Sequence, residues 1–203
     1  MAELVRENIE WVNFRWDHAP DTTRRRVLLI GDSIANGYHG TVSARLEGFA
    51  NVDLMATSKA INDPAIRRET QYATEDYSHA LIHFNNGLHG WHLSVDEYAA
   101  ALRGYVKFLR DLAPDAKLIW ATSTPMTVNG QPETNCPEMN PKVLARNAAA
   151  APIMQEFGIP VNDLYSLVVG KAELRSGDAA HFSAAGRELQ GKQVAEVIRK
   201  ALD

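Results

Sequence analysis

One stretch, Val27-Leu28-Leu29-Ile30-Gly31-Asp32-Ser33, decides the fold of this 203-residue chain. Four consecutive apolar residues follow the basic run at 24–26 and stop at a glycine, a pattern that predicts a short buried strand. The strand delivers Ser33 into a turn bounded by glycines. In an open α/β sheet, ligands bind beyond the carboxyl ends of the strands. Ser33 is therefore predicted to face a ligand-binding crevice.

Short apolar runs bounded by turn or charged residues recur along the chain and alternate with helical patterns. Together with the first run they predict five strands, at 27–30, 52–56, 80–84, 117–122 and 159–162. This alternation predicts a mostly parallel sheet with helices on both faces, joined by right-handed crossovers. We expect a three-layer α/β/α sandwich with a five-stranded sheet, built as a single domain over residues 1–203.

Helix signals lie between the predicted strands. Ser94 and Glu97 form a capping box, and apolar residues then recur at helical spacing as far as residue 109. Asn140 followed by a proline opens another helix, which ends at Gly158, and Ser183 is the predicted N-cap of the last helix.

A serine hydroxyl needs a neighbouring base, and that base needs a third group to orient it. Four of the seven histidines, His18, His39, His79 and His83, are best explained as structural or solvated residues. His181 differs because it follows Asp178 by three residues in a turn. An aspartate at this spacing can accept the Nδ1 proton of the histidine, leaving Nε2 free to take a proton from a serine.

With these residues, the chain resembles the SGNH hydrolases of the GDSL esterase and lipase superfamily. The resemblance rests on the blocks Gly31-Asp32-Ser33-Ile34 and Asp178-Ala179-Ala180-His181, which occur in the expected order on the expected kinds of element. It implies the flavodoxin-like SGNH hydrolase fold and a catalytic triad of Ser33, His181 and Asp178. It also implies hydrolysis of carboxylic esters through an acyl-enzyme, with no cofactor.

The family's two middle blocks, which hold the oxyanion, are less well preserved. The G-x-N-D block corresponds to the segment His83-Phe84-Asn85-Asn86-Gly87-Leu88-His89-Gly90. The register that we prefer makes Asn85 the oxyanion donor together with the Ser33 amide, because the downstream Gly-Leu-x-Gly also matches. A rival register gives this role to His89.

The segment after the second strand, 55–62, contains no glycine, although the family carries one there. A backbone amide is available from any residue except proline, so a donor from 59–62 is expected without being assigned. Lys59 is interpreted as a solvated loop residue, or alternatively as a cation near the oxyanion or an acidic substrate.

Substrate choice is expected to come from the rim of the crevice. Asp32 and Trp91 are the candidate substrate-binding residues, since an exposed tryptophan suits stacking on a sugar ring. The segment 126–140 is predicted to be a long polar loop.

We expect O-deacetylation of a carbohydrate. The alternatives are the same serine chemistry on a lysophospholipid, short-chain ester or thioester, and a non-catalytic binding module with a degraded oxyanion hole.

Composition narrows the class of protein further. The net charge of −4, with the short arginine run at 24–26 interpreted as solvated, argues against a nucleic-acid binder. The chain has neither a G-x-G-x-x-G nor a P-loop motif, and the pair His89 and His92 does not make a compelling metal site.

No membrane span or signal peptide is apparent, and the single cysteine, Cys136, is compatible with a reducing compartment, so a cytoplasmic location is slightly favoured. The sequence leaves the oligomeric state open.

Overall fold

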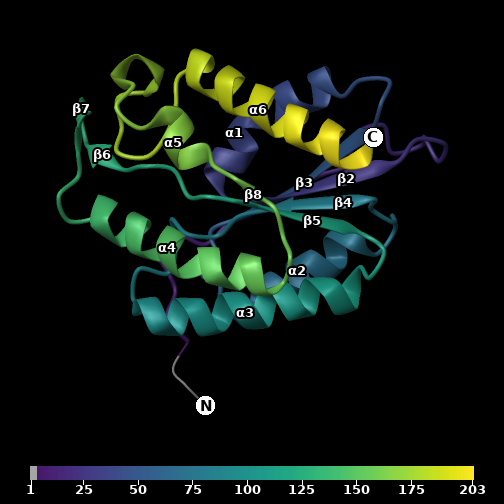
Figure 1. The fold of residues 1–203 in the computed structure, drawn as a ribbon, viewed down its shortest axis with the longest axis horizontal. Helices are drawn as coiled ribbons and strands as arrows, with labels where there is room; N and C mark the ends of the chain where they lie inside the picture. The colour runs from purple at the N-terminus through teal and green to yellow at the C-terminus, as the bar shows by residue number, and fades with distance from the viewer. Residues whose placement is uncertain (1–3) are drawn as a thin grey trace.

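A six-stranded sheet lies between two layers of helices in the computed structural model, which describes residues 4–203 (Figure 1). Its strands follow the spatial order β1-β3-β2-β4-β5-β8. They are β1 (Val12–Arg15), β2 (Arg26–Gly31), β3 (Asn51–Thr57), β4 (Leu81–Phe84), β5 (Lys117–Ala121) and β8 (Val161–Asn162). Five of them are parallel, and β1 pairs antiparallel with β3 at the edge of the sheet.

Each face of the sheet is covered by three α-helices (Figure 1). One layer contains α1 (Ser33–Arg45), α5 (Leu164–Val168) and α6 (Ala184–Leu202), and the other contains α2 (Pro64–Thr74), α3 (Val95–Leu112) and α4 (Asn140–Glu156). A short 3₁₀-helix, η1 (Ala172–Leu174), precedes the last loop. No helix within residues 4–203 combines the length and apolar character that crossing a bilayer requires.

The apolar run of β2 is continuous because both of its faces are buried. Val27 and Leu29 pack into the core beneath α1 and α6, whereas Leu28 and Ile30 pack into the core beneath α3 and α4. A strand covered on both faces has no solvent side to occupy with polar residues. The expectation of a three-layer α/β/α sandwich is confirmed.

All five predicted strands are present, but the sheet has a sixth strand that the sequence pattern did not indicate. β1 is four residues long and mostly exposed, so its alternation of apolar and polar residues (Val12, Asn13, Phe14, Arg15) is too short to indicate a strand by itself. The predicted loop at 126–140 is also more ordered than expected. It contains the hairpin of β6 (Thr127–Val128) and β7 (Gln131–Asn135), which turns at Asn129 and Gly130.

The predicted helix signals lie at helix ends. Ser94 and Glu97 form both hydrogen bonds of the capping box at the start of α3, and the Ser183 side chain caps α6. Gly158 follows α4 with a φ of 62°, the left-handed conformation that favours glycine after a helix. Local sequence therefore sets these boundaries.

The interpretation of the arginine run as solvated is wrong for Arg26. Its guanidinium is buried and makes two hydrogen bonds to Asp53, at 2.6 and 2.8 Å, and His79 Nε2 lies 2.8 Å from the same carboxylate. A charged side chain can be buried here because its partner is buried with it. This cluster lies at the amino end of β2, away from the end that carries Ser33.

Candidate active site

Ser33 is the first residue of α1 and directly follows the turn at the carboxyl end of β2. The Asp32 carboxylate caps the helix by accepting a hydrogen bond of 2.9 Å from the Ile34 amide. A Cβ on Gly31 would lie only 2.6 Å from the Cβ of Ala35, so glycine is needed for strand and helix to approach this closely. The Ser33 amide, at the start of the helix, has no intrahelical acceptor.

The structure brings Ser33, His181 and Asp178 into one hydrogen-bonded series. Ser33 Oγ lies 2.8 Å from His181 Nε2, and His181 Nδ1 lies 3.0 Å from Asp178 Oδ2. Ser33 and His181 are 148 residues apart in the chain. Because an ionised carboxylate can only accept, the proton of the neutral imidazole lies on Nδ1 and Nε2 can accept the serine proton.

Four hydrogen bonds converge on the Asp178 carboxylate. Oδ1 accepts from the amides of Ala180 and His181, at 2.9 and 2.7 Å, and Oδ2 accepts from Ser176 Oγ at 3.1 Å as well as from the imidazole. Partial burial opposes ionisation, but the hydrogen bonds outweigh it and hold the pKa of Asp178 well below its ordinary value. Asp178 is therefore a fixed negative charge beside His181.

The loop that carries Asp178 and His181 is held by a buried arginine that the sequence reasoning missed. Arg175 Nη2 donates to the carbonyls of Pro125 and Ala179, both at 3.0 Å, and the guanidinium lies 4.4 Å from the Phe182 ring centroid. The main chain adds a hydrogen bond of 2.9 Å from Thr127 to Ala179. The hairpin of β6 and β7 thus supports the acid and base, and no motif in the sequence indicated this contact.

A cavity of about 340 Å³ opens beside the triad. Ser33, Asp178 and His181 line it, together with the apolar side chains of Ile34 and Phe182. Its other walls carry polar residues from α1 and α6. The cavity places space for a substrate directly next to the candidate nucleophile.

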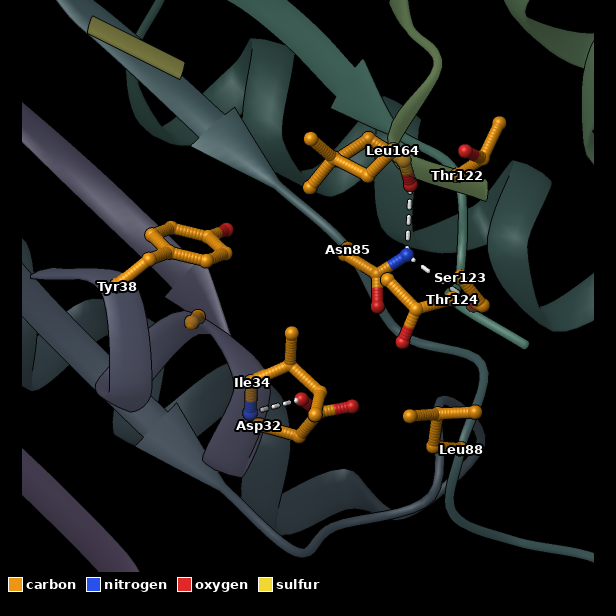
Figure 2. Close-up of a pocket in the computed structure, with 11 residues that line it drawn as sticks. Asp32, Ile34, Tyr38, Asn85, Leu88, Thr122, Ser123, Thr124 and Leu164 are labelled. Atoms are coloured by element: carbon orange, nitrogen blue, oxygen red, sulfur yellow. Dashed lines mark hydrogen bonds between the residues drawn. The ribbon is translucent and has the colours of Figure 1, made fainter. Parts of the chain in front are cut away.

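Asn85, the predicted oxyanion donor, does not line this cavity. Its Nδ2 donates to the Ala121 carbonyl at 2.6 Å and to Ser123 Oγ at 3.2 Å, as Figure 2 shows. Both amide hydrogens are thereby used within the protein. Donation to an oxyanion would require the side chain to rotate, so the role of Asn85 stays a prediction.

Asp32, predicted to bind substrate, is 3% exposed and does not line the triad cavity. It lines a separate cavity of about 10 Å³, into which the side chains of Asp32, Asn85 and Thr124 point (Figure 2). The structure gives Asp32 the role of helix cap, and this arrangement does not support its contact with substrate.

Trp91 and His89 lie on the loop that follows β4 but do not reach the triad cavity. Trp91 lines a different cavity, of about 210 Å³, and one face of its ring is covered by the Arg146 guanidinium at 4.5 Å. His89 Nδ1 lies 2.8 Å from Glu7 Oε1, which directs the ring towards the N-terminal segment. Stacking of Trp91 on substrate stays a prediction.

Contacts in the segment after β3 exclude some of its backbone amides as the second donor to the oxyanion. The Ser58 amide donates to Trp11 O and the Lys59 amide to Thr57 Oγ1. The amides of Ala60, Ile61 and Asn62 have no acceptor within residues 4–203, so they are the remaining candidates. The interpretation of Lys59 as solvated is wrong, because its ammonium group is buried in an ion pair with Glu10 at 2.7 Å. The N-terminal segment supplies that carboxylate.

Within the described chain, no group of three or more histidine, cysteine, aspartate or glutamate side chains is arranged to hold a metal ion. His89 and His92 therefore have no third ligand of these types among the described residues.

Comparison with known proteins identifies the fold. Neither a protein-family model nor a curated protein sequence matches the chain. Solved structures do match. The aryl esterase of M. smegmatis superposes with a TM-score of 0.70 at 14% identity, covering 87% of this chain and 99% of that chain. A carbohydrate acetylesterase from Sinorhizobium meliloti gives a TM-score of 0.70 at 14% identity, covering 88% and 100%. A GDSL-like lipase from Bacteroides thetaiotaomicron gives 0.65 at 16% identity, covering 87% and 89%.

The chain therefore has the fold of the SGNH hydrolases, the superfamily of GDSL-like lipases and esterases. At identities this low the likeness establishes the fold alone.

Proposed function

We propose that the protein is a serine esterase that hydrolyses carboxylic esters through an acyl-enzyme. The observation that carries the proposal is the continuous hydrogen-bonded series from Ser33 Oγ through His181 to the Asp178 carboxylate. A nucleophile, a base and an orienting acid in this geometry constitute the machinery of acyl transfer. The adjoining cavity of about 340 Å³ gives an ester room to approach the serine.

Each residue has a definite role in the proposed reaction. His181 Nε2 takes the Ser33 hydroxyl proton as Oγ attacks the ester carbonyl, and the resulting imidazolium then gives that proton to the departing alcohol. Water, deprotonated by the same nitrogen, attacks the acyl-enzyme and releases the acid. Asp178 keeps the imidazole in the required tautomer and stabilises its protonated form. The Ser33 amide at the start of α1 is a donor for the oxyanion.

For the substrate we favour an O-acetylated carbohydrate. The walls of the triad cavity that α1 and α6 form both carry polar side chains. A site for a long acyl chain is expected to have a continuous apolar lining instead. One structural relative is described as a carbohydrate acetylesterase. Other relatives are described as a lipase and an aryl esterase, so the choice among substrates rests mainly on the cavity.

The proposal is tested with p-nitrophenyl acetate and the variant Ser33→Ala. Hydrolysis should fall by about 1,000-fold or more in Ser33→Ala. It should persist in Ser78→Ala, a matched change at an exposed serine. Labelling of wild-type protein by a fluorophosphonate, absent in Ser33→Ala, would identify the nucleophile independently. Equal background rates in all three proteins, with no labelling, would instead favour a binding module.

Substrate class is tested with p-nitrophenyl esters of increasing acyl length and with acetylated sugars. The carbohydrate proposal expects kcat/KM to be highest for acetate, with acetate released from acetylated sugars. A clear preference for long acyl chains would overturn it in favour of a lysophospholipid or related lipid ester.

A further inference from the structure

Arg187, on the first turns of α6, extends across α1 into the triad cavity. Its Cδ lies 3.1 Å from the position that a Cβ on Gly37 would take, so the absence of a side chain at Gly37 lets the arginine stem lie against α1. Arg187 and Gly37 both line the cavity that contains Ser33 and His181. The side chain is exposed, and its guanidinium has no hydrogen-bond or ion-pair partner within the described part of the chain.

The neighbouring acidic groups already have partners of their own. Among the described residues, Asp178 is the only carboxylate lining this cavity, and its oxygens are occupied by the imidazole, two amides and a serine hydroxyl. Glu188, the next residue on α6, binds Arg45 at 2.6 Å and Thr41 at 3.0 Å across the helix pair. The positive charge of Arg187 at the cavity is therefore not neutralised by either carboxylate.

A second polar group of α6 lies on the same wall, one turn further along. Gln190 is among the residues that line the cavity but has no exposed surface, and neither atom of its amide has a partner among residues 4–203. Burying such a group without a hydrogen-bond partner is unfavourable. This wall thus has two polar side chains without partners in the described part of the chain, of which Arg187 is the one exposed to a ligand.

We propose that this wall is a recognition subsite for a carboxylate on the alcohol portion of the ester, as in an acetylated uronic acid or another acidic sugar. The inference rests on the proposed esterase function and specifies its substrate. A planar guanidinium matches a carboxylate in two parallel hydrogen bonds. With a net charge of −4, the protein as a whole repels an anion, so an anionic substrate requires a local cation at the cavity.

The first experiment compares 4-acetoxybenzoate with 4-acetoxybenzamide, which have nearly the same size but differ in charge. The ratio of their kcat/KM values should fall about 10-fold in Arg187→Gln, mainly through KM for the anion. Lys192→Gln, which removes the same charge further along α6, should keep the wild-type ratio. The wild-type ratio should also fall with added salt. An unchanged ratio in Arg187→Gln, in protein that hydrolyses both esters, would overturn the subsite.

Mono(4-nitrophenyl) succinate places the carboxylate on the acyl side. If Arg187→Gln weakens hydrolysis of this ester and not of 4-acetoxybenzoate, the assignment to the alcohol portion is wrong.

A second experiment does not depend on turnover. Ser33→Ala is titrated with galacturonate and with galactose, and binding is followed by NMR. Galacturonate should bind more tightly, and the difference should disappear in Ser33→Ala/Arg187→Gln. Equal binding of the two sugars would overturn the subsite even if esterase activity is present. Preferential binding of galacturonate without any esterase activity would uphold the subsite and reject the proposed reaction.

Discussion

Arg146 Nη2 donates a hydrogen bond of 2.6 Å to the carbonyl oxygen of Gly90, and Nη1 donates to the carbonyls of Gly87 and His89 at 3.0 and 2.7 Å. The guanidinium is 2% exposed and lies over the rings of Trp91 and Tyr98. No carboxylate pairs with it within residues 4–203. Three carbonyl dipoles and two ring faces stabilise its charge instead. Arg146 thus joins α4 to the loop that follows β4, which begins at the predicted oxyanion donor.

We expect Arg146→Ala to lower the free energy of unfolding by about 3 kcal/mol, because it leaves three carbonyls without a donor and opens a void. It should also lower kcat, since the loop loses its fixed position. Urea unfolding and ester hydrolysis measure the two effects, and low concentrations of guanidinium should restore part of the lost kcat. Arg68→Ala, at an exposed position of α2, is the matched control. Equal stability of the two variants would contradict this role for Arg146.

Asn85→Ala tests whether the amide rotates to meet the oxyanion. If it does, kcat should fall roughly 100-fold or more, with KM little changed. If Asn85 serves only to hold Ala121 and Ser123, the variant should lose stability while kcat stays within a few-fold of wild type. Comparing kcat with the urea midpoint separates the two roles, and the second result would reject our register for this block.

The triad predicts a loss of activity on the acid side. The pKa of Asp178 lies well below its ordinary value, so this carboxyl stays ionised from pH 5 to 8. Histidine is the side chain whose charge ordinarily changes in that range, and protonated His181 cannot accept the serine proton. We therefore expect kcat/KM to be lower in acid than at neutral pH. A flat profile from pH 5 to 8 would exclude His181 as the base.

The orienting acid can be tested separately. Asp178→Asn removes the charge that fixes the imidazole tautomer and should lower kcat about 100-fold or more. Because the carboxylate is about half exposed, stability at pH 7 should change little. A thermal melt alongside the rate measurement distinguishes this outcome from unfolding.

His83 predicts a second, independent effect of pH, on stability. Burial in β4 lowers the pKa of His83 to about 4. Its Nε2 lies 3.1 Å from Asn162 Nδ2, whose orientation is fixed by a hydrogen bond of 2.7 Å from Gln193 to Asn162 Oδ1, so Nε2 accepts and the ring is neutral. Between pH 6.5 and 4 the unfolded chain binds a proton at this residue that the folded chain does not. Stability should therefore fall as pH decreases through that range, by up to roughly 3 kcal/mol.

The measurement is the free energy of unfolding in urea at pH 7.5 and pH 5. His83→Gln, which has no titrating group, should show a smaller decrease between the two pH values than wild type. The same decrease in both proteins would mean that other groups cause the acid sensitivity.

Local sequence determined much of this architecture. The uninterrupted apolar run of β2 predicted a strand buried on both faces, and Ser94, Gly158 and Ser183 marked helix ends because capping depends on residues a few positions apart. For the same reason, the spacing of Asp178 and His181 predicted a contact that one short loop makes by itself. The edge strand β1 and the hairpin of β6 and β7 were missed, because strands of two to five residues are too short for an apolar pattern to indicate them. In addition, β1 depends on hydrogen bonds to β3, about 40 residues further along the chain.

Only the tertiary structure decided three contacts: the hydrogen bond between Ser33 and His181, the buried ion pair between Lys59 and Glu10, and the hydrogen bonds from Arg146 to the loop after β4. Each joins segments far apart in the chain, so no local periodicity or spacing encodes it. The sequence thus determined the layered fold and the residue types of the triad. The packing of the layers decided which polar side chains meet one another and which, like Arg187, remain available to a substrate.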